Sequence, residues 1–195
     1  MSMIQSGTGE GYFAGVTVNN RVMTTGIDLS LTEAATETGD TYNINTSTLP
    51  LTSSAEHALL YVKNNETTNI IIDTTIINIK DFVGTDGQPV LKIYRNPTGG
   101  TLITDETECT ITNRNYGSAK RVDINCYEGG QGKTVTGDSI EIFLPSTAAL
   151  TFNSFSTLVV LPKGSSIALS YTPPAGITSL DMVAAFNLTL NGTQL

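Results

Sequence analysis

The residue types best suited to catalysis are few in this 195-residue chain. His57 is the only histidine, so a Ser-His-Asp or Cys-His arrangement would have to use it. It follows Glu56 and precedes Ala58, and no Gly-x-Ser-x-Gly nucleophile motif occurs in the chain. We interpret His57 as a structural histidine, either hydrogen-bonded or facing solvent. The sequence therefore predicts no catalytic residues, and we expect that the protein is not an enzyme.

Two glycine-rich stretches resemble phosphate-binding loops but lack essential positions. Residues 128–134 (EGGQGKT) end like a P-loop, yet Tyr127 stands where the first glycine is required, and a turn follows instead of a helix. Residues 7–11 (GTGEG) are followed by Tyr12, where the dinucleotide-binding pattern needs its last glycine. We interpret both stretches as loops and predict no cofactor.

Acidic residues gather at Asp105, Glu106 and Glu108. Paired carboxylates can hydrolyse glycosides when they are held at a defined separation, and acidic loops can bind calcium. Adjacent acids in a loop establish neither burial nor separation, and the spaced ligands of an EF-hand loop are absent. We expect a solvated acidic turn.

Cys109 and Cys126 flank a predicted turn at Gly117-Ser118. A hairpin folded about that turn places the two cysteines opposite each other, which leaves open a cross-strand disulfide, a metal pair or two buried thiols. Two ligands without CxxC spacing do not make a zinc site. A reducing cytosolic origin favours free thiols that pack as small hydrophobes. We predict no metal site.

Composition points to sheet and excludes several partners. Charged residues make up only 14% of the chain, and the net charge is −8. Thr, Ser, Asn and Gly replace the missing charge, and β-branched Thr favours strands over helices. Lysines and arginines are scattered, whereas nucleic-acid binding needs a basic face, so we expect neither nucleic-acid binding nor docking to an anionic membrane. No apolar run approaches the roughly 18 residues of a membrane span, and residues 1–7 lack a signal-peptide pattern.

The distribution of residue types along the chain predicts an N-terminal arm over residues 1–26 and one all-β domain over residues 27–195. The arm is rich in Gly and Asn. After a polar bridge at residues 27–40, short strand-like runs alternate with turn residues, which is typical of an antiparallel sandwich or barrel. Only residues 53–60 show helical potential, sufficient for one turn at most.

The clearest strands lie near the end of the chain. Apolar residues recur at every second position over residues 180–190, and residues 166–171 alternate in the same way, so each strand directs one row to the core. Pro173, Pro174 and Gly176 separate the two runs, and we predict a β-hairpin there. Residues 140–144 form another alternating strand. Residues 69–82 are apolar on both faces, which predicts a central strand covered on both sides or one that enters a subunit contact.

Short blocks distributed over most of the chain, in order, resemble segments of tailed-bacteriophage virion proteins. These blocks are GYFAGVTVNNRV at 11–22, GDTYNIN at 39–45, ALLYVKNNE at 58–66, NYGSAK at 115–120, LPKGSSI at 161–167 and TPPAG at 172–176. The resemblance implies a jelly-roll-type β-sandwich with an extended N-terminal segment. It also implies a structural protein of the virion, made in the bacterial cytoplasm, that decorates or cements the outer capsid surface as a homotrimer.

This resemblance defines the expected partners. The arm is too polar to form its own core, and we hypothesise that Tyr12, Phe13, Val16 and Val18 anchor it to the major capsid protein or another virion protein. The alternative is a tail, baseplate or fibre module that binds host-surface glycan. No sequence feature selects glycan binding, because Trp is absent and the seven Tyr are dispersed. A polysaccharide depolymerase is disfavoured, since so short a chain lacks a long repetitive β-helix.

Overall fold

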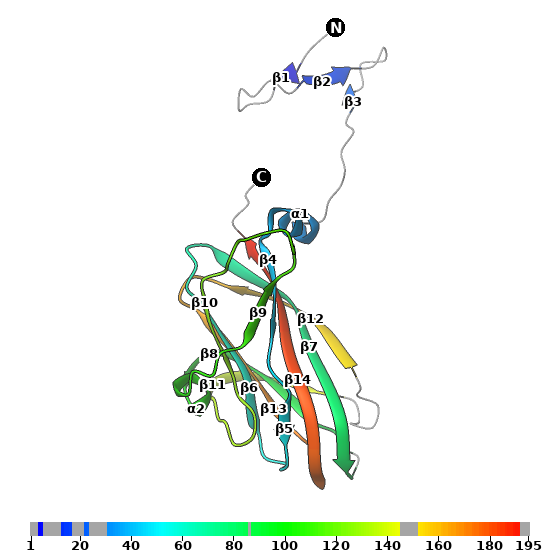
Figure 1. Cartoon of the computed structure of the whole chain (residues 1–195), viewed down its shortest axis with the longest axis vertical. Helices are drawn as coiled ribbons and strands as arrows, with labels where there is room; N and C mark the ends of the chain where they lie inside the picture. Colours follow the sequence, from blue (N-terminus) through cyan, green and yellow to red (C-terminus); the bar gives the residue numbers. More distant parts are fainter. Residues whose placement is uncertain are drawn as a thin grey trace. The chain divides into compact units, whose positions relative to one another are not determined.

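The structure of the protein is a computed structural model that describes residues 4–5, 13–16, 22–23, 31–85, 87–144 and 152–191 (Figure 1). The chain divides into two compact units, residues 1–31 and residues 32–195. The first unit contains a small antiparallel sheet of three strands, β1 (Ile4–Gln5), β2 (Phe13–Val16) and β3 (Val22–Met23).

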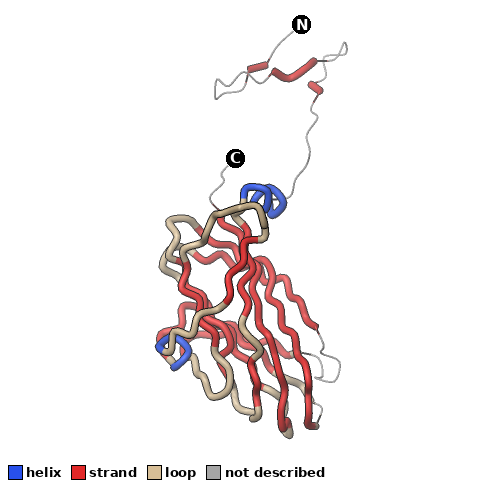
Figure 2. The backbone as a smooth tube through the Cα atoms, in the orientation of Figure 1, coloured by secondary structure: helices blue, strands red, loops and turns tan. Residues whose placement is uncertain are grey.

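The second unit is a sandwich of two antiparallel sheets, whose strands are seen in Figure 2. One sheet has the order β10 (Ile124–Glu128), β6 (His57–Asn64), β13 (Ser166–Thr172), β8 (Val90–Gly99) and β11 (Thr136–Phe143). The other has the order β12 (Phe152–Leu161), β7 (Asn69–Gly84), β14 (Ile177–Asn191), β4 (Thr41–Asn45) and β9 (Thr110–Asn113), and β5 (Leu49–Leu51) also pairs with β14.

The strand order is that of a jelly roll. Eight strands form the framework, in chain order β4, β6, β7, β8, β11, β12, β13 and β14. The six-stranded sheet contains the sixth, third, eighth and first of them, and the five-stranded sheet contains the second, seventh, fourth and fifth. Most connections therefore cross from one sheet to the other, as in a jelly roll of two Greek keys. The predicted all-β, jelly-roll-type sandwich is confirmed.

The hairpin predicted at residues 173–176 is wrong. β13 pairs with β6 and β8, whereas β14 pairs with β7, β4 and β5, so the two strands belong to opposite sheets. Both strands nevertheless direct apolar rows into the same core. Alternating apolar and polar residues show that a strand directs one row of side chains into a core. They do not show whether two successive strands are hydrogen-bonded in one sheet or packed face to face in two sheets.

The core lies between the two sheets. The predicted inward row of β14 is confirmed, because Leu180, Met182, Ala184, Phe186 and Leu188 are all buried. β7 is central, as predicted, since it lies between β12 and β14. Its outward residues are half-exposed, however, and the strands covered on both faces are β6 and β13. A second, smaller core covers part of the outer face of the five-stranded sheet. It consists of Ala58, Tyr61, Tyr94, Leu102, Val135 and Ala168.

Two helices accompany the sheets, α1 (Leu31–Thr38) and α2 (Thr101–Thr104). Residues 53–60, for which the sequence allowed at most one helical turn leading into a strand, bend at 53–55 and enter β6 at His57 without a helical turn. α1 was not expected from its polar composition. Glu33 lies in its first turn, where a carboxylate is favourable, and Ala35 is buried. Neither helix of the described residues is long and apolar enough to cross a bilayer.

Gly39 ends α1 and gives a first prediction. Its φ is +78°, and the backbone N–H groups of Gly39 and Asp40 donate to Thr36 and Ala35 carbonyls. A Cβ at Gly39 would also overlap Ser118 Oγ. We expect G39A to lower the free energy of unfolding by about 2 kcal/mol, through left-handed backbone strain and steric crowding together. Urea denaturation measures this change.

The matched control is G164A. Gly164 has nearly the same φ, +77°, but no atom lies within 4 Å of a Cβ built there. We expect a loss of only about 1 kcal/mol, from the backbone strain alone. Equal losses in the two variants would contradict the close approach of Ser118 to Gly39.

Candidate functional site

The two long sides of the sandwich differ. On one side the segment just before β9 meets β10 through an antiparallel bridge between Glu108 and Tyr127. Hydrogen bonds from Cys109 N–H to the Cys126 carbonyl (3.2 Å) and from Glu128 N–H to the Thr107 carbonyl (2.7 Å) flank this bridge. On the other side, β11 ends one sheet and β12 ends the other, and no pairing joins them among the described residues. The sandwich is therefore closed at one side and open at the other.

The closed side contains the two cysteines in the predicted register. Cys109 lies opposite Cys126, and both are free thiols, as favoured from the sequence. Burial raises the pKa of the Cys126 thiol, which keeps it protonated. The predicted hairpin does not continue, because β9 turns away to pair with β4 and β10 pairs with β6. This pair of strands joins the two sheets instead of forming one ladder.

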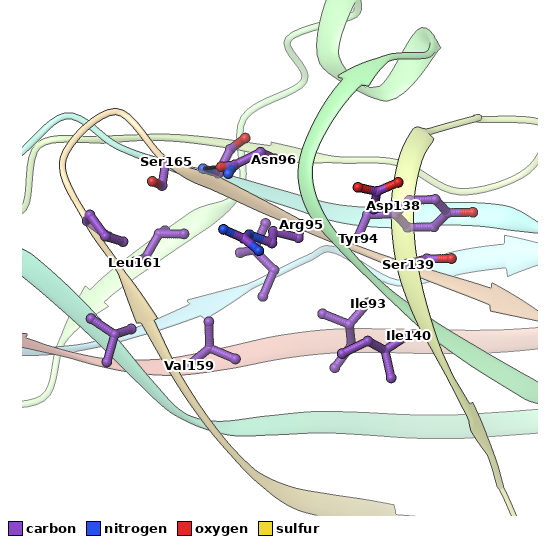
Figure 3. A pocket seen from close by; sticks show the side chains of 14 residues that line it. Ile93, Tyr94, Arg95, Asn96, Asp138, Ser139, Ile140, Val159, Leu161 and Ser165 are labelled. Atoms are coloured by element: carbon purple, nitrogen blue, oxygen red, sulfur yellow. Dashed lines mark hydrogen bonds between the residues drawn. The ribbon is translucent and has the colours of Figure 1, made fainter.

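The open side contains a groove of about 540 Å³ between β8, β11, β12 and the start of β13. Figure 3 shows Arg95 in the middle of this groove, with Leu161 and Val159 to one side and Ile93 and Ile140 to the other. Among the described residues, the Arg95 side chain makes no hydrogen bond or ion pair, although Asp138 lies opposite it in the ladder. Arginine surrounded by apolar side chains is a frequent anchor of protein–protein interfaces.

Large apolar side chains are exposed beside this groove. Ile140 on β11 is 70% exposed, and Leu158 and Val160 on β12 are 73% and 52% exposed. We call these three residues, together with Arg95 and Val159, the open-edge patch. β12 has no charged residue and no proline, which are the usual means of protecting an edge strand from association. Exposed apolar surface on such an edge is typical of a docking surface.

The backbone of β12 is distorted within the patch. The register with β7 shifts between Ser156 and Val159, which marks a bulge, and Leu158 has a φ of +32°. A positive φ at leucine costs of order 1–2 kcal/mol. Bulges redirect side chains at sheet edges, and this bulge lies at Leu158, the most exposed apolar side chain of the patch. Strain at an exposed apolar residue favours a role in binding over a role in folding.

His57 is a structural residue, as interpreted from the sequence. It is 1% exposed, and its Nδ1 accepts a hydrogen bond from Gly132 N–H (3.1 Å). Nε2 therefore carries the proton and donates to Ser53, whose Oγ lies 3.1 Å away. A catalytic triad requires the opposite arrangement, with one ring nitrogen donating to a carboxylate. His57 instead holds the 129–133 loop against the start of β6.

The glycine-rich loop at residues 128–134 also has a structural role. Gly129 and Gly130 donate their backbone N–H groups to the carbonyls of Leu59 and Ala58. These groups are consequently not directed at a phosphate, and β11 follows the loop instead of a helix. The other glycine-rich stretch, residues 7–11, lies outside the described residues.

The predicted acidic turn is exposed. Asp105 forms an ion pair with Lys133, and Glu108 belongs to the bridge that closes the sandwich. Among the described residues, no group of three His, Cys, Asp or Glu side chains is arranged to hold a metal ion. Of the hypothesised anchor residues, Tyr12 and Val18 lie outside the described residues, whereas Phe13 and Val16 are the ends of β2.

Glu56 is the centre of a polar cluster that sequence reasoning missed. Its Oε1 accepts hydrogen bonds from Tyr94 (2.5 Å) and Ser170 (2.6 Å), and its Oε2 accepts one from Lys92 (2.8 Å), which also contacts Glu141 (3.2 Å). Burial alone would raise the pKa of Glu56, but the three hydrogen bonds outweigh it and lower the pKa. The same Glu56 contact raises the pKa of Lys92. Both oxygens are occupied, so the cluster joins β6, β13 and β8.

This cluster predicts an acid-dependent stability. Because the folded pKa of Glu56 lies below its ordinary value of 4.5, the ionised group stabilises the fold above about pH 4.5 and loses this contribution as pH falls through the folded pKa. We expect E56Q to be less stable than the natural chain at pH 7, and the difference to shrink toward pH 3. Urea denaturation across this pH range measures it.

E141Q is the control, because it removes the more exposed of the two carboxylates that contact Lys92. We expect a smaller loss of stability at pH 7, since exposed ion pairs contribute little. A stability difference for E56Q that does not change with pH would refute the account of the cluster.

Comparison with known proteins does not assign the open-edge patch a partner. The chain matches no protein-family model, and a search of curated proteins gives no match. The residues of the patch were not found from the sequence, although the run STLVVL at 156–161, without charge or proline, was the available signal. The structure itself shows an all-β sandwich of jelly-roll order, closed at one side and open at the other.

Proposed function

We propose that this chain is a non-enzymatic structural protein of a tailed-bacteriophage virion, a decoration or cement protein that binds the outer capsid surface. The observation that supports it best is the open-edge patch. The polar clusters of the sandwich hold its own loops, and the open-edge patch exposes apolar side chains at an unprotected edge, which suits assembly with a protein partner.

A neighbouring copy of the same chain is the occupant that the patch favours. The chain has a net charge of −8, so another copy supplies acidic groups for the unpaired Arg95. Copies of the chain can also bury each other's exposed edges before they bind a virus particle. A homotrimer built in this way is a closed assembly, which leaves no edge free for open-ended association.

In this proposal the N-terminal arm, and not the open-edge patch, attaches the protein to the capsid. Residues 1–26 would bind the major capsid protein or another virion protein, with Tyr12, Phe13, Val16 and Val18 as anchors. Each contact need be only modest, because identical contacts on a symmetric lattice add up to tight attachment.

Substitution in the patch tests self-association. We expect V160D to raise the dissociation constant of the trimer at least about tenfold, because it places a carboxylate in a contact that excludes water. Sedimentation equilibrium measures the mass, and circular dichroism checks the fold.

V83D is the matched control. Val83 is 57% exposed but does not line the groove. V83D should leave the dissociation constant of the trimer unchanged. A natural chain that is monomeric at micromolar concentration, or equal effects of V160D and V83D, would overturn the role of the patch.

Removal of the arm tests attachment to the capsid. We expect a chain lacking residues 1–26 to remain trimeric but to occupy less than about a tenth of the sites on heads that lack the protein, because multivalent attachment is lost with its anchors. Cosedimentation with heads, and electron microscopy of the decorated particle, measure occupancy. Unchanged occupancy would refute the anchor hypothesis, and absence of the full chain from the head surface would refute the proposed function.

A further inference from the structure

A second surface, on the outer face of the six-stranded sheet, has a different chemistry. A polar trough of about 340 Å³ lies over β9, β4 and β14, which are adjacent strands in Figure 1. The register places Thr112, Asn43 and Asn187 in one row across these strands, and Asn45 lies two residues along β4 on the same face. Asn113 at the end of β9, and Arg114 and Tyr116 after it, complete the lining.

Hydrogen-bonding groups in the trough are only partly used. Asn43 Nδ2 donates to Asn187 Oδ1 (2.7 Å), which leaves Asn43 Oδ1 as an acceptor and Asn187 Nδ2 as a donor. Among the described residues, the side chains of Asn45, Arg114 and Tyr116 make no hydrogen bond or ion pair. The trough therefore presents planar amides and a guanidinium whose donors and acceptors are available to a ligand.

The loop that carries Arg114 and Tyr116 is held in place. Asn113 Nδ2 donates to the carbonyls of Gly39 (2.9 Å) and Lys120 (3.2 Å), and Asn115 Nδ2 donates to the carbonyl of Glu37 (2.8 Å). Lys120 also forms an ion pair with Asp40 (2.8 Å). A fixed loop reduces the entropy lost on binding, which favours recognition of a small ligand.

Tyr116 is the most exposed aromatic residue of the described chain, at 92%. The hydrogen bonds of Asn115 and Ser118 fold the turn around it, and its ring contributes nothing to either core. A flat apolar ring beside polar groups suits a pyranose, which has an apolar face and an edge of hydroxyls. A single amide can accept from one ring hydroxyl and donate to its neighbour.

We propose that this trough binds a saccharide, with Tyr116 stacking on the sugar face and Asn43, Asn45, Asn187 and Arg114 contacting its hydroxyls. Polyanions such as nucleic acid are disfavoured, because Arg114 is the one cationic side chain of the lining and the whole chain carries a charge of −8. An apolar ligand is disfavoured because the lining is mainly amide, hydroxyl and guanidinium groups. The proposal is independent of the capsid role and would apply equally to a tail or fibre protein that binds host glycan.

Nuclear magnetic resonance of the full chain tests this site. The probes are D-glucose, D-galactose, D-mannose and N-acetyl-D-glucosamine, each titrated to about 50 mM, since single sugars bind in the millimolar range when few groups contact them. We expect at least one probe to shift the side-chain amide signals of Asn45 and Asn187. Y116A and N45A should each weaken that binding about fivefold or more, and Y116F should retain it through the ring.

N78A is the matched control for N45A. Asn78 is exposed on β7 of the same sheet and does not line the trough. N78A should leave sugar binding unchanged. V160D should also leave it unchanged, so the test of the trough does not depend on the open-edge patch. If none of the four sugars shifts the amide signals, or if Y116A binds as tightly as the natural chain, the saccharide site is refuted.

Discussion

Two sheets that share one core have two long sides, and each side must be closed by the chain, covered by a partner or left exposed. In this protein the Glu108–Tyr127 bridge closes one side by backbone hydrogen bonds between β10 and the segment just before β9. No such bond joins β11 to β12 in the described residues. Some core residues near the open side, among them Ile93, Ile142 and Val159, are only partly buried. The asymmetry between the two sides determines where a partner can add buried apolar area.

Several buried or hydrogen-bonded polar side chains belong to the scaffold itself. His57 fixes a loop to β6, and Glu56, just before β6, connects to β8 through Tyr94 and Lys92 and to β13 through Ser170. The Cys126 thiol is kept protonated by burial. Shifted pKa values often mark active sites, but they also mark structural ion-pair networks. Here the polar atoms of these groups face one another or the backbone, so their chemistry is directed inward. By contrast, the side chains of Arg95 and Asn45, which make no hydrogen bond or ion pair among the described residues, lie in the open-edge patch and in the trough.

The two surfaces suit two kinds of partner. The open-edge patch is apolar, strained at Leu158 and centred on one arginine, which favours a large and dry protein contact. The trough is polar, shallow and held by a fixed loop, which favours a small hydroxyl-rich ligand. They lie on different elements, β8, β11 and β12 for the patch and β9, β4 and β14 for the trough. A symmetric assembly through the patch would present several troughs at once and strengthen weak sugar binding.

Composition and alternation alone determined the all-β class, the inward row of β14 and the register that sets Cys109 opposite Cys126, because each depends on local period or on the distance from a turn. They did not determine that β13 and β14 belong to opposite sheets, nor that β6 and β13, and not β7, are buried on both faces. The residue order contains no signal for which strands pair across long loops, and helix α1 is too polar to be recognised before its partners are known. The open-edge patch and the polar trough exist only in the tertiary structure, since each unites side chains from strands far apart in the chain.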